Sequence, residues 1–481
     1  MRGEIGARII LSVLLAVSIF SPPMSGALVT FGKTNPQNQN QNPPPPPTPA
    51  LHVSCNDNSE CIEDAQCTVR NATLGKRCYC EEGFFEESPL FCNGRQCAKF
   101  SAIARRYSSI AANPADKDSA KPKTGIVMLN MGGPTNINKV HEYLLRIMTD
   151  RDMIQLPVQS ILGPWIAKRR TMEVQKKYFE IGGGSPILQW TNKQGELLCE
   201  KLDEISPETA PHKYYVAFRY ADPLTEDTLE RIRNDGVRHT VLFSQYPQYS
   251  CSTSGSSFNA IYNYYRTREL PSEMKWSVID RWATHPLLIK TFVERIKEEL
   301  AHFPNENRDD VIILFSAHSL PLQVVNRGDS YPAEVGATVA LVMQELNYCN
   351  PYSLVWQSKV GPMPWLGPFT DEALKDYVKQ GKKNFILVPI AFVNEHIETL
   401  HELDIEYCQE LAKELGIERI RRAAAPNVHP LFIDALADIV ASHLKSKQTI
   451  SPKFLTRCPH CVNTSCDASK SWYAKICGIQ R

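Results

Sequence analysis

Two short segments place histidine and carboxylate side chains directly after apolar runs. His318 follows the run 311–315, and His396 and Glu398 follow the run 385–388. Both runs have the length and composition of fully buried strands, and open α/β sheets bind ligands at the carboxyl ends of such strands. Imidazole and carboxylate groups together can remove protons and handle a divalent metal near neutral pH. The sequence therefore predicts an acid–base or metal site where two buried strands end.

Further carboxylates follow Glu398 at helical spacing. Glu402 and Glu406 lie four and eight residues after it, with leucine and isoleucine residues recurring between them. Residues four apart share one face of a helix, so the three carboxylates are predicted to form one acidic row. A solvated helix face is the plain alternative, but the row begins beside a strand-end histidine, which favours a functional site. The H-E-x-x-H pattern of zinc proteases is missing, which disfavours that class.

The length and the charge of the chain limit the classes of protein to consider. It has 481 residues, of which 43% are hydrophobic, enough for two or three domains with real cores. Lysine and arginine number 53 against 52 acidic residues, a formal net charge of +1. A nucleic-acid-binding protein carries a basic surface, so we expect no nucleic-acid partner.

From residue 121 onward, strand-like apolar runs alternate with helical segments, as in parallel sheets built from βαβ units. The two halves resemble each other, since 240–247 and 385–392 are similar strand-to-loop transitions. We predict an α/β protein with two doubly wound, Rossmann-like lobes, at 121–300 and 301–448, and a cleft between them. The predicted strands are 125–130, 214–218, 240–243, 276–280, 311–315, 354–358, 385–388 and 419–422.

The amino-terminal segments have a different composition. Residues 1–27 combine two arginines, an apolar run and small residues, as a secretory signal does. Residues 28–54 are rich in proline, glutamine and asparagine and are predicted to be an extended linker. Seven cysteines in 55–97, with a glycosylation sequon at 71–73, indicate a small EGF-like or related disulfide module. Because seven is odd, either one thiol is unpaired or the module is truncated.

Residues 98–120 resemble a different targeting signal. The stretch 101–109 is basic, serine-rich and free of acids, like the end of a mitochondrial presequence, with a predicted cut between Tyr107 and Ser108. One chain cannot follow both a secretory and a mitochondrial address. We therefore interpret the secretory-like part as a fused or alternative exon joined to an enzyme.

Two glycine clusters, at 132–133 and 182–184, lack the G-x-G-x-x-G and P-loop patterns, which disfavours a nucleotide site. They either make turns or let the backbone approach a flat ligand closely. Between them, the apolar stretch 144–170 ends in three basic residues. We predict a lip that contacts a membrane surface or an apolar anionic substrate; an amphipathic helix packed on the core is the alternative.

A cysteine trio lies in the tail 449–481, beyond the last helix of the second lobe. Cys458, Cys461 and Cys466 have the spacing Cys-x2-Cys-x4-Cys, which predicts ligation of a metal or a cluster. Tetrahedral zinc and iron–sulfur clusters both require a fourth ligand. His460, Cys477 and Cys251 all remain candidates on spacing alone.

Longer motifs resemble the ferrochelatase family of animal mitochondria. The similarity runs from about residue 121 to about residue 466 and leaves out 1–100. It implies a lyase that inserts Fe²⁺ into protoporphyrin IX, giving protohaem and two protons, as the last step of haem biosynthesis. The motifs are LNMGGP (129–134), QYPQYSCST (245–253), FSAHSLP (315–321), QSKVGP (357–362), WLGP (365–368) and HIETL (396–400).

The resemblance also implies roles for single residues. His318 is implied as the proton acceptor or metal-delivery group, with His396 and Glu398 opposite it. His285 and Asp438 match positions that also have catalytic roles. The implied path for protons or iron consists of Glu395 (where the family commonly has aspartate), Glu402 and Glu406. The implied contacts of the porphyrin are Met131, Arg170, Tyr178, Ser185, Tyr246 and Trp365.

The resemblance implies that Cys251 completes a ligand set with Cys458, Cys461 and Cys466, and that these hold a [2Fe–2S] cluster. It further implies a homodimer bound peripherally, through 144–170, to the matrix side of the mitochondrial inner membrane. Two other hypotheses stay open. One is a secreted, non-catalytic tetrapyrrole-binding protein, and the other is a zinc-bound redox or scaffold protein.

Overall fold

The computed structural model describes residues 65–68, 77–80, 85–88, 91–93, 122–446 and 448–479. The chain divides into two compact units, Met1–Ser119 and Ala120–Arg481.

In the first unit, two antiparallel pairs of short strands lie in the cysteine-rich segment. They are β1 (Ala65–Thr68) with β2 (Arg77–Cys80), and β3 (Phe85–Ser88) with β4 (Phe91–Asn93). The EGF-like module stays a prediction. The predicted signal, linker and presequence-like segments, at 1–27, 28–54 and 98–120, lie outside the described residues.

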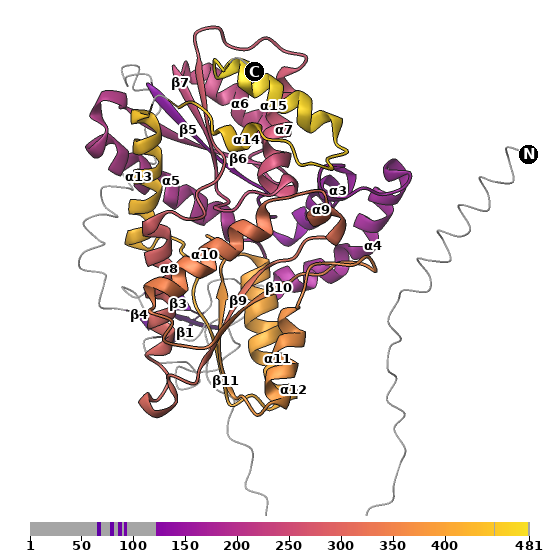
Figure 1. Ribbon diagram of the computed structural model, residues 1–481, viewed down its shortest axis with the longest axis vertical. Helices are drawn as coiled ribbons and strands as arrows, with labels where there is room; N and C mark the ends of the chain where they lie inside the picture. The colour runs from indigo at the N-terminus through magenta and orange to yellow at the C-terminus, as the bar shows by residue number, and fades with distance from the viewer. Residues whose placement is uncertain are drawn as a thin grey trace, which may run out of the picture. The chain divides into compact units, whose positions relative to one another are not determined.

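The second unit contains two parallel sheets of four strands each (Figure 1). In the first sheet the order is β6-β5-β7-β8, and in the second it is β10-β9-β11-β12. In each sheet the chain begins on an inner strand, winds one way to the edge and then returns the other way, which is a doubly wound arrangement. The repeated order confirms the predicted fold class and the similarity of the two lobes.

All eight predicted strands are present. They are β5 (Thr124–Asn130), β6 (His212–Phe218), β7 (His239–Ser244), β8 (Lys275–Ile279), β9 (Ile312–His318), β10 (Tyr352–Gln357), β11 (Asn384–Pro389) and β12 (Arg419–Arg422). Every residue of β5 is buried. Helices cover both faces of a doubly wound sheet, which explains why its inner strands are continuous apolar runs.

Helices connect the strands within each lobe. Those of the first lobe are α3 (Val140–Thr149), α4 (Gln159–Glu180), α5 (Ile187–Ile205), α6 (Thr225–Asp235), α7 (Ser256–Tyr265) and α8 (Pro286–Leu300). Those of the second are α9 (Leu322–Asn326), α10 (Tyr331–Glu345), α11 (Thr370–Lys379), the π-helix η6 (Glu398–Leu411), α12 (Ala412–Leu415) and α13 (Pro430–Lys445). Short turns of helix are η2 (Ile137–Lys139), η3 (Pro207–Thr209), η4 (Cys251–Gly255) and η5 (Asn305–Asn307).

The two lobes share one hydrophobic core. Ile126 and Val241 of the first sheet belong to the same buried cluster as Ile313 and Ile386 of the second. Phe432 of α13 joins them from between the lobes, where α13 packs against α5 and α8. The lobes are therefore parts of a single packed body.

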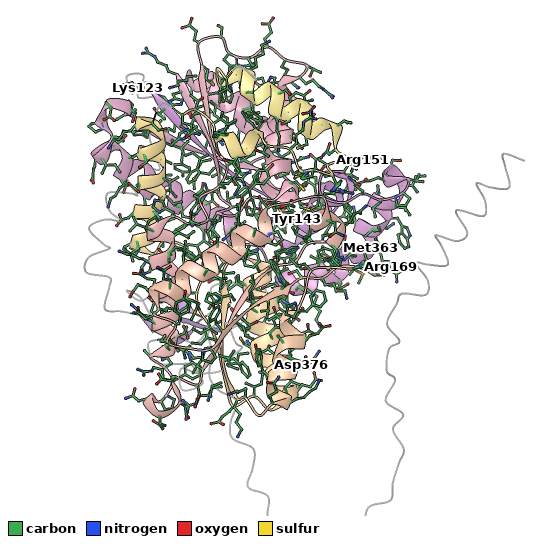
Figure 2. The ribbon with its side chains drawn as sticks, viewed as in Figure 1. Lys123, Tyr143, Arg151, Arg169, Met363 and Asp376 are labelled. Atoms are coloured by element: carbon green, nitrogen blue, oxygen red, sulfur yellow. The ribbon has the colours of Figure 1, made fainter. Side chains whose placement is uncertain are left out.

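The hairpin of α3 and α4, which we call the lip, has a small core of its own. Leu144 and Met148 point inward with Ala167 and Tyr178. Other apolar side chains of α4 are exposed, among them Ile161 at 66% and Trp165 at 43%. Figure 2 shows Arg151 and Arg169 of this region on the same side of the molecule as Met363 of the second lobe. No helix in the described part of the chain is both long and apolar enough to span a membrane.

The carboxyl-terminal tail packs on the first lobe. It contains α14 (Pro452–Leu455) and α15 (Thr464–Ile476), and α15 runs alongside α7 (Figure 1). The ring of Phe454 lies 5.0 Å from that of Phe258, and Tyr473 lies 5.7 Å from the same ring. This aromatic cluster holds the cysteine loop, which connects α14 to α15, against the first lobe.

Candidate active site

A cavity of about 1000 Å³ lies where the carboxyl ends of the two sheets meet. Its walls come from both lobes. Met131 and Tyr246 follow β5 and β7, His318 ends β9, and His396 and Glu398 follow β11. This volume is of the order that holds a drug-sized or cofactor-sized ligand. The site predicted from the two strand-end segments is therefore a single cavity.

His318 and Glu398 form a pair in this cavity. The Nδ1 atom of His318 lies 2.9 Å from Oε2 of Glu398. The imidazole is 37% exposed, and its ring meets that of Trp365 edge to face at 6.4 Å. Because Nδ1 is taken by the carboxylate, Nε2 is the nitrogen left for a ligand.

The pair shifts the titration of both members. Burial lowers the pKa of His318, but the negative charge of Glu398 and its hydrogen bond outweigh burial, so this pKa lies above its ordinary value. Burial alone would raise the pKa of Glu398; the charge of His318 and its hydrogen bond hold it well below its ordinary value. The carboxylate therefore makes the imidazole a stronger base.

His396 has a defined tautomer. Its Nδ1 lies 3.0 Å from the backbone oxygen of Asn394, and a carbonyl oxygen can only accept a hydrogen bond. Nδ1 therefore carries the hydrogen, and Nε2 keeps the lone pair, 3.8 Å from Oε2 of Glu398. The backbone N–H of His396 donates to Oγ1 of Thr399 at 3.0 Å, which holds the turn into the following helix.

The acidic row lies on a π-helix rather than the expected α-helix. A π-helix forms i→i+5 hydrogen bonds and therefore has more than 3.6 residues per turn. Side chains four residues apart consequently lie closer to one line along the helix. Glu402 lines the cavity and accepts hydrogen bonds from Ser358, from Gln357 at 3.1 Å and from Tyr407 at 3.1 Å. Burial and the charge of Glu398 raise the pKa of Glu402, despite these bonds.

Glu406 is the outermost of the three predicted acids, and it is ion-paired. Nζ of Lys177, on α4, donates to its Oε1 at 2.7 Å. Nδ1 of His401 lies 3.1 Å from the same oxygen. The outer end of the row is thus bound to the lip.

Met131 is positioned by Tyr246. Its backbone N–H donates to the Tyr246 hydroxyl at 3.0 Å, and that hydroxyl donates to Oδ1 of Asn130 at 3.3 Å. Gly132 follows with a φ of +77°, and an added Cβ would lie 2.6 Å from the ring of Phe218. The backbone turn and the close packing therefore both require a glycine here. Of the two interpretations of the first glycine cluster, this geometry favours a turn.

The other predicted porphyrin contacts divide into two groups. Arg170, Tyr178 and Trp365 line the cavity, but Ser185 does not. Ser185 is buried, and its N–H donates to the backbone oxygen of Pro134 at 2.8 Å.

Glu395 also lies outside the cavity lining. Its Oε1 accepts from Arg422 and from the N–H of Ala425, each at 2.8 Å. Arg422, on β12, also pairs with Asp404, on η6, at 2.6 Å. Glu395 therefore connects the loop that follows β11 to both β12 and η6.

His285 and Asp438 contact each other, away from the cavity. Nε2 of His285 lies 3.0 Å from Oδ2 of Asp438, and the carboxylate is 59% exposed. His285 precedes α8 and Asp438 lies on α13, so this pair is on the outside of the seam between the lobes.

The four predicted cluster cysteines are free thiols and electrostatic neighbours. Burial and then Asp329 raise the pKa of Cys251, with a smaller contribution from Cys458, and burial raises the pKa of Cys466 to about 11. Cys461 contributes to raising the pKa of both Cys458 and Cys466. Four neighbouring thiols match the chemistry of an iron–sulfur ligand set. In the part of the chain that the structure describes, no three such side chains already converge on one point as metal ligands.

Several residues at the site were not predicted from the sequence. Ser358 and Tyr407 bind Glu402, Lys177 binds Glu406, and His401 lies beside Glu406. Ser358 belongs to a recognised motif and has a positive φ of 65°. The spacing of Lys177 carries no signal, because it approaches Glu406 only after α4 packs on η6. His401 lies five residues before Glu406 on the same π-helix.

Comparison with known proteins agrees with this geometry. The family model described as Ferrochelatase matches residues 123–444. A protein named "Ferrochelatase, mitochondrial" from Drosophila melanogaster is 70% identical over 375 residues, 78% of this chain and 98% of that protein. The protein of the same name from Homo sapiens is 56% identical over 381 residues, 79% of this chain and 90% of that protein. The predicted resemblance is confirmed: this chain belongs to the ferrochelatase family.

Proposed function

We propose that the cavity binds protoporphyrin IX and that the chain inserts Fe²⁺ into it, releasing two protons and forming protohaem. The observation that supports this most directly is the His318–Glu398 pair in a cavity that also contains the acidic row. The test is protohaem formation by the purified full chain from Fe²⁺ and protoporphyrin IX under anaerobic conditions. A protein that binds the porphyrin but forms no haem would instead be a tetrapyrrole carrier.

Metal insertion requires that both pyrrole N–H protons leave. His318 can accept them one at a time at Nε2, since Nδ1 is held by Glu398, and it passes the first proton to solvent before it takes the second. The neighbouring carboxylate stabilises the imidazolium that forms, as general-base catalysis requires. We therefore assign proton removal to His318 and charge stabilisation to Glu398.

The metal approaches, in this proposal, from the side of His396 and the acidic row. The Nε2 lone pair of His396 and the carboxylates of Glu402 and Glu406 are ligands that a divalent iron ion accepts. Glu395 is ion-paired to Arg422 outside the cavity, so we assign it a positioning role.

The remaining cavity walls suit a flat apolar ring with anionic side chains. Met131, Tyr246 and Trp365 supply apolar and aromatic surface, and Arg170 supplies a cation for a propionate. Tyr178 lines the same wall. Ser185 is buried behind it and supports the loop that follows β5.

The pair of His285 and Asp438 is proposed to exchange protons at the surface of the protein, outside the cavity. Its exposed carboxylate and the imidazole 3.0 Å away support this role. An unchanged kcat for His285→Asn would exclude the pair from the reaction.

We propose that Cys251, Cys458, Cys461 and Cys466 hold a [2Fe–2S] cluster. Cys477 is buried in a hydrophobic cluster beside Ile450 and Tyr473, which speaks against it as the fourth ligand. When bound, the cluster would join the first lobe to the tail through four thiolates.

Substitution of Cys251 tests this assignment. We expect Cys251→Ser to abolish the visible absorption of the purified protein, because a hydroxyl is a poor ligand for iron–sulfur clusters. Cys349→Ser is the matched control, since Cys349 is exposed and is not among the four. A coloured Cys251→Ser protein would point to His460 as the fourth ligand, and a colourless parent containing one zinc would support the zinc-scaffold alternative.

We propose that the protein is peripherally bound to the matrix side of the mitochondrial inner membrane, through 144–170. The exposed Ile161 and Trp165 with the basic Lys168 nearby support an interfacial lip. Isolation from mitochondria with a mature amino terminus near Ser108 is the expected result. A glycosylated chain that retains 28–100 would favour the secreted alternative. The proposed homodimer is tested by sedimentation of the same preparation.

A further inference from the structure

The acidic row runs outward from the cavity, and its members become progressively more exposed. Glu402 and Glu406 are half-buried, whereas Glu410 and Glu414, each four residues further on, are exposed and still line the same cavity. Glu406 therefore stands where the row passes from solvent into the protein. Any cation that follows the row inward passes its carboxylate.

His401 faces Glu406 from one side. The imidazole is only 7% exposed. Its Nε2 lies 2.6 Å from Oε2 of Glu180, on α4, while its Nδ1 lies 3.1 Å from Oε1 of Glu406 and makes no hydrogen bond. A carboxylate only accepts, so Nε2 carries the hydrogen and the neutral ring has its lone pair on Nδ1. A carboxylate that orients a histidine in this way is the usual outer partner of a metal-binding imidazole.

Lys177 faces Glu406 from α4. Its ammonium group lies 2.7 Å from the same Oε1 that Nδ1 of His401 approaches. An imidazole lone pair and a carboxylate oxygen thus converge on one place, with a cation already beside it. An ammonium on a long flexible side chain is a positive charge that a divalent ion can displace.

We propose that Nδ1 of His401 and the Glu406 carboxylate form an entrance site for Fe²⁺. In this site Glu180 orients His401, and the metal displaces the ammonium group of Lys177 from Glu406. Imidazole and carboxylate suit this ion. With two protein ligands and water in the remaining positions, the site is weak and exchanges its metal readily, as transfer toward the cavity requires. The inference rests on the proposed function of the acidic row as the metal route.

Two substitutions of the full chain move the KM for Fe²⁺ in opposite directions. His401→Gln keeps a donor for Glu180 but removes the Nδ1 ligand, so we expect the KM for Fe²⁺ to rise about fivefold. Lys177→Gln removes the competing cation, so we expect the KM for Fe²⁺ to fall about threefold. Lys177→Arg restores the cation and should restore the parent value. The KM for protoporphyrin IX should stay constant in all three, which a merely structural effect on the lip would not achieve.

Lys176→Gln is the matched control for the lysine. It makes the same change of charge one residue away on α4, but Lys176 is 78% exposed and pairs with Glu180 at 3.6 Å rather than with Glu406. Equal effects of Lys176→Gln and Lys177→Gln on the KM for Fe²⁺ would overturn the role of Lys177. An unchanged KM in His401→Gln, together with a raised KM in Glu406→Gln, would remove His401 as a ligand and leave the route intact. An unchanged KM in Glu406→Gln would refute the route itself.

Discussion

Substitution of His318 by alanine should lower kcat for metal insertion about a thousandfold, within the range that a positioned general base contributes. The variant loses the imidazole that is paired with Glu398 at 2.9 Å and open to the cavity at Nε2. Folding should be little affected, because this side chain is 37% exposed and is not part of the core. The measurement is the initial rate of haem formation at saturating Fe²⁺ and porphyrin.

His302→Ala is the control for this substitution, since His302 is exposed and lies outside the cavity lining. It should keep the parent rate. Porphyrin affinity, followed by fluorescence quenching, should change less than about threefold in His318→Ala, because the imidazole acts on the protons rather than on binding. A variant that binds porphyrin and retains most of its kcat would show that another group removes the protons.

Substitution of Glu398 by glutamine should move the acidic limb of the activity–pH profile to lower pH. In the parent, His318 must be deprotonated to act, and its pKa lies above the ordinary value of about 6.5. Activity should therefore rise with pH through a region above that value. In the variant, the larger of the two charges that raise the pKa of His318 is removed, and only the smaller contribution of Glu402 remains against burial, so this pKa falls.

The same variant should lose about a hundredfold in kcat at its own optimum, because the imidazolium no longer has a carboxylate to stabilise it. The measurement is kcat across the pH range, with Glu418→Gln as control, since Glu418 is exposed on the outside of the second lobe. An acidic limb of the Glu398→Gln profile that stays at the parent pH, or moves to higher pH, would contradict the assignment of His318 as the titrating base.

The sheets and the inner wall of the site were predictable from the sequence because their causes are local. Each inner strand is a continuous apolar run, and the residues just past β9 and β11 necessarily meet at one edge of the second sheet. The acidic row was predicted from spacing alone. Its π-helical form was not, since the same spacing satisfies an α-helix.

The outer part of the site depends on packing between distant segments. Lys177 precedes Glu406 by 229 residues, and the two side chains meet because α4 packs on η6. Glu395 is adjacent to His396 in sequence, yet Arg422 holds it outside the cavity. Adjacency to His396 therefore does not bring Glu395 into the cavity lining, and only tertiary packing brings Lys177 to Glu406.

The core that the two lobes share has a consequence for how the ligand enters. Opening the lobes about a hinge would expose apolar surface of Ile126, Ile313 and Phe432, at a cost of roughly 25 cal/mol for each Å². The lip has a separate small core and can shift without this cost. Such a shift is coupled to the site, because Ile397, which lies between His396 and Glu398, packs against the core of the lip, and Lys177 binds Glu406. Changes in the sequence of the lip can therefore alter both the rate of ligand exchange and the position of Glu398.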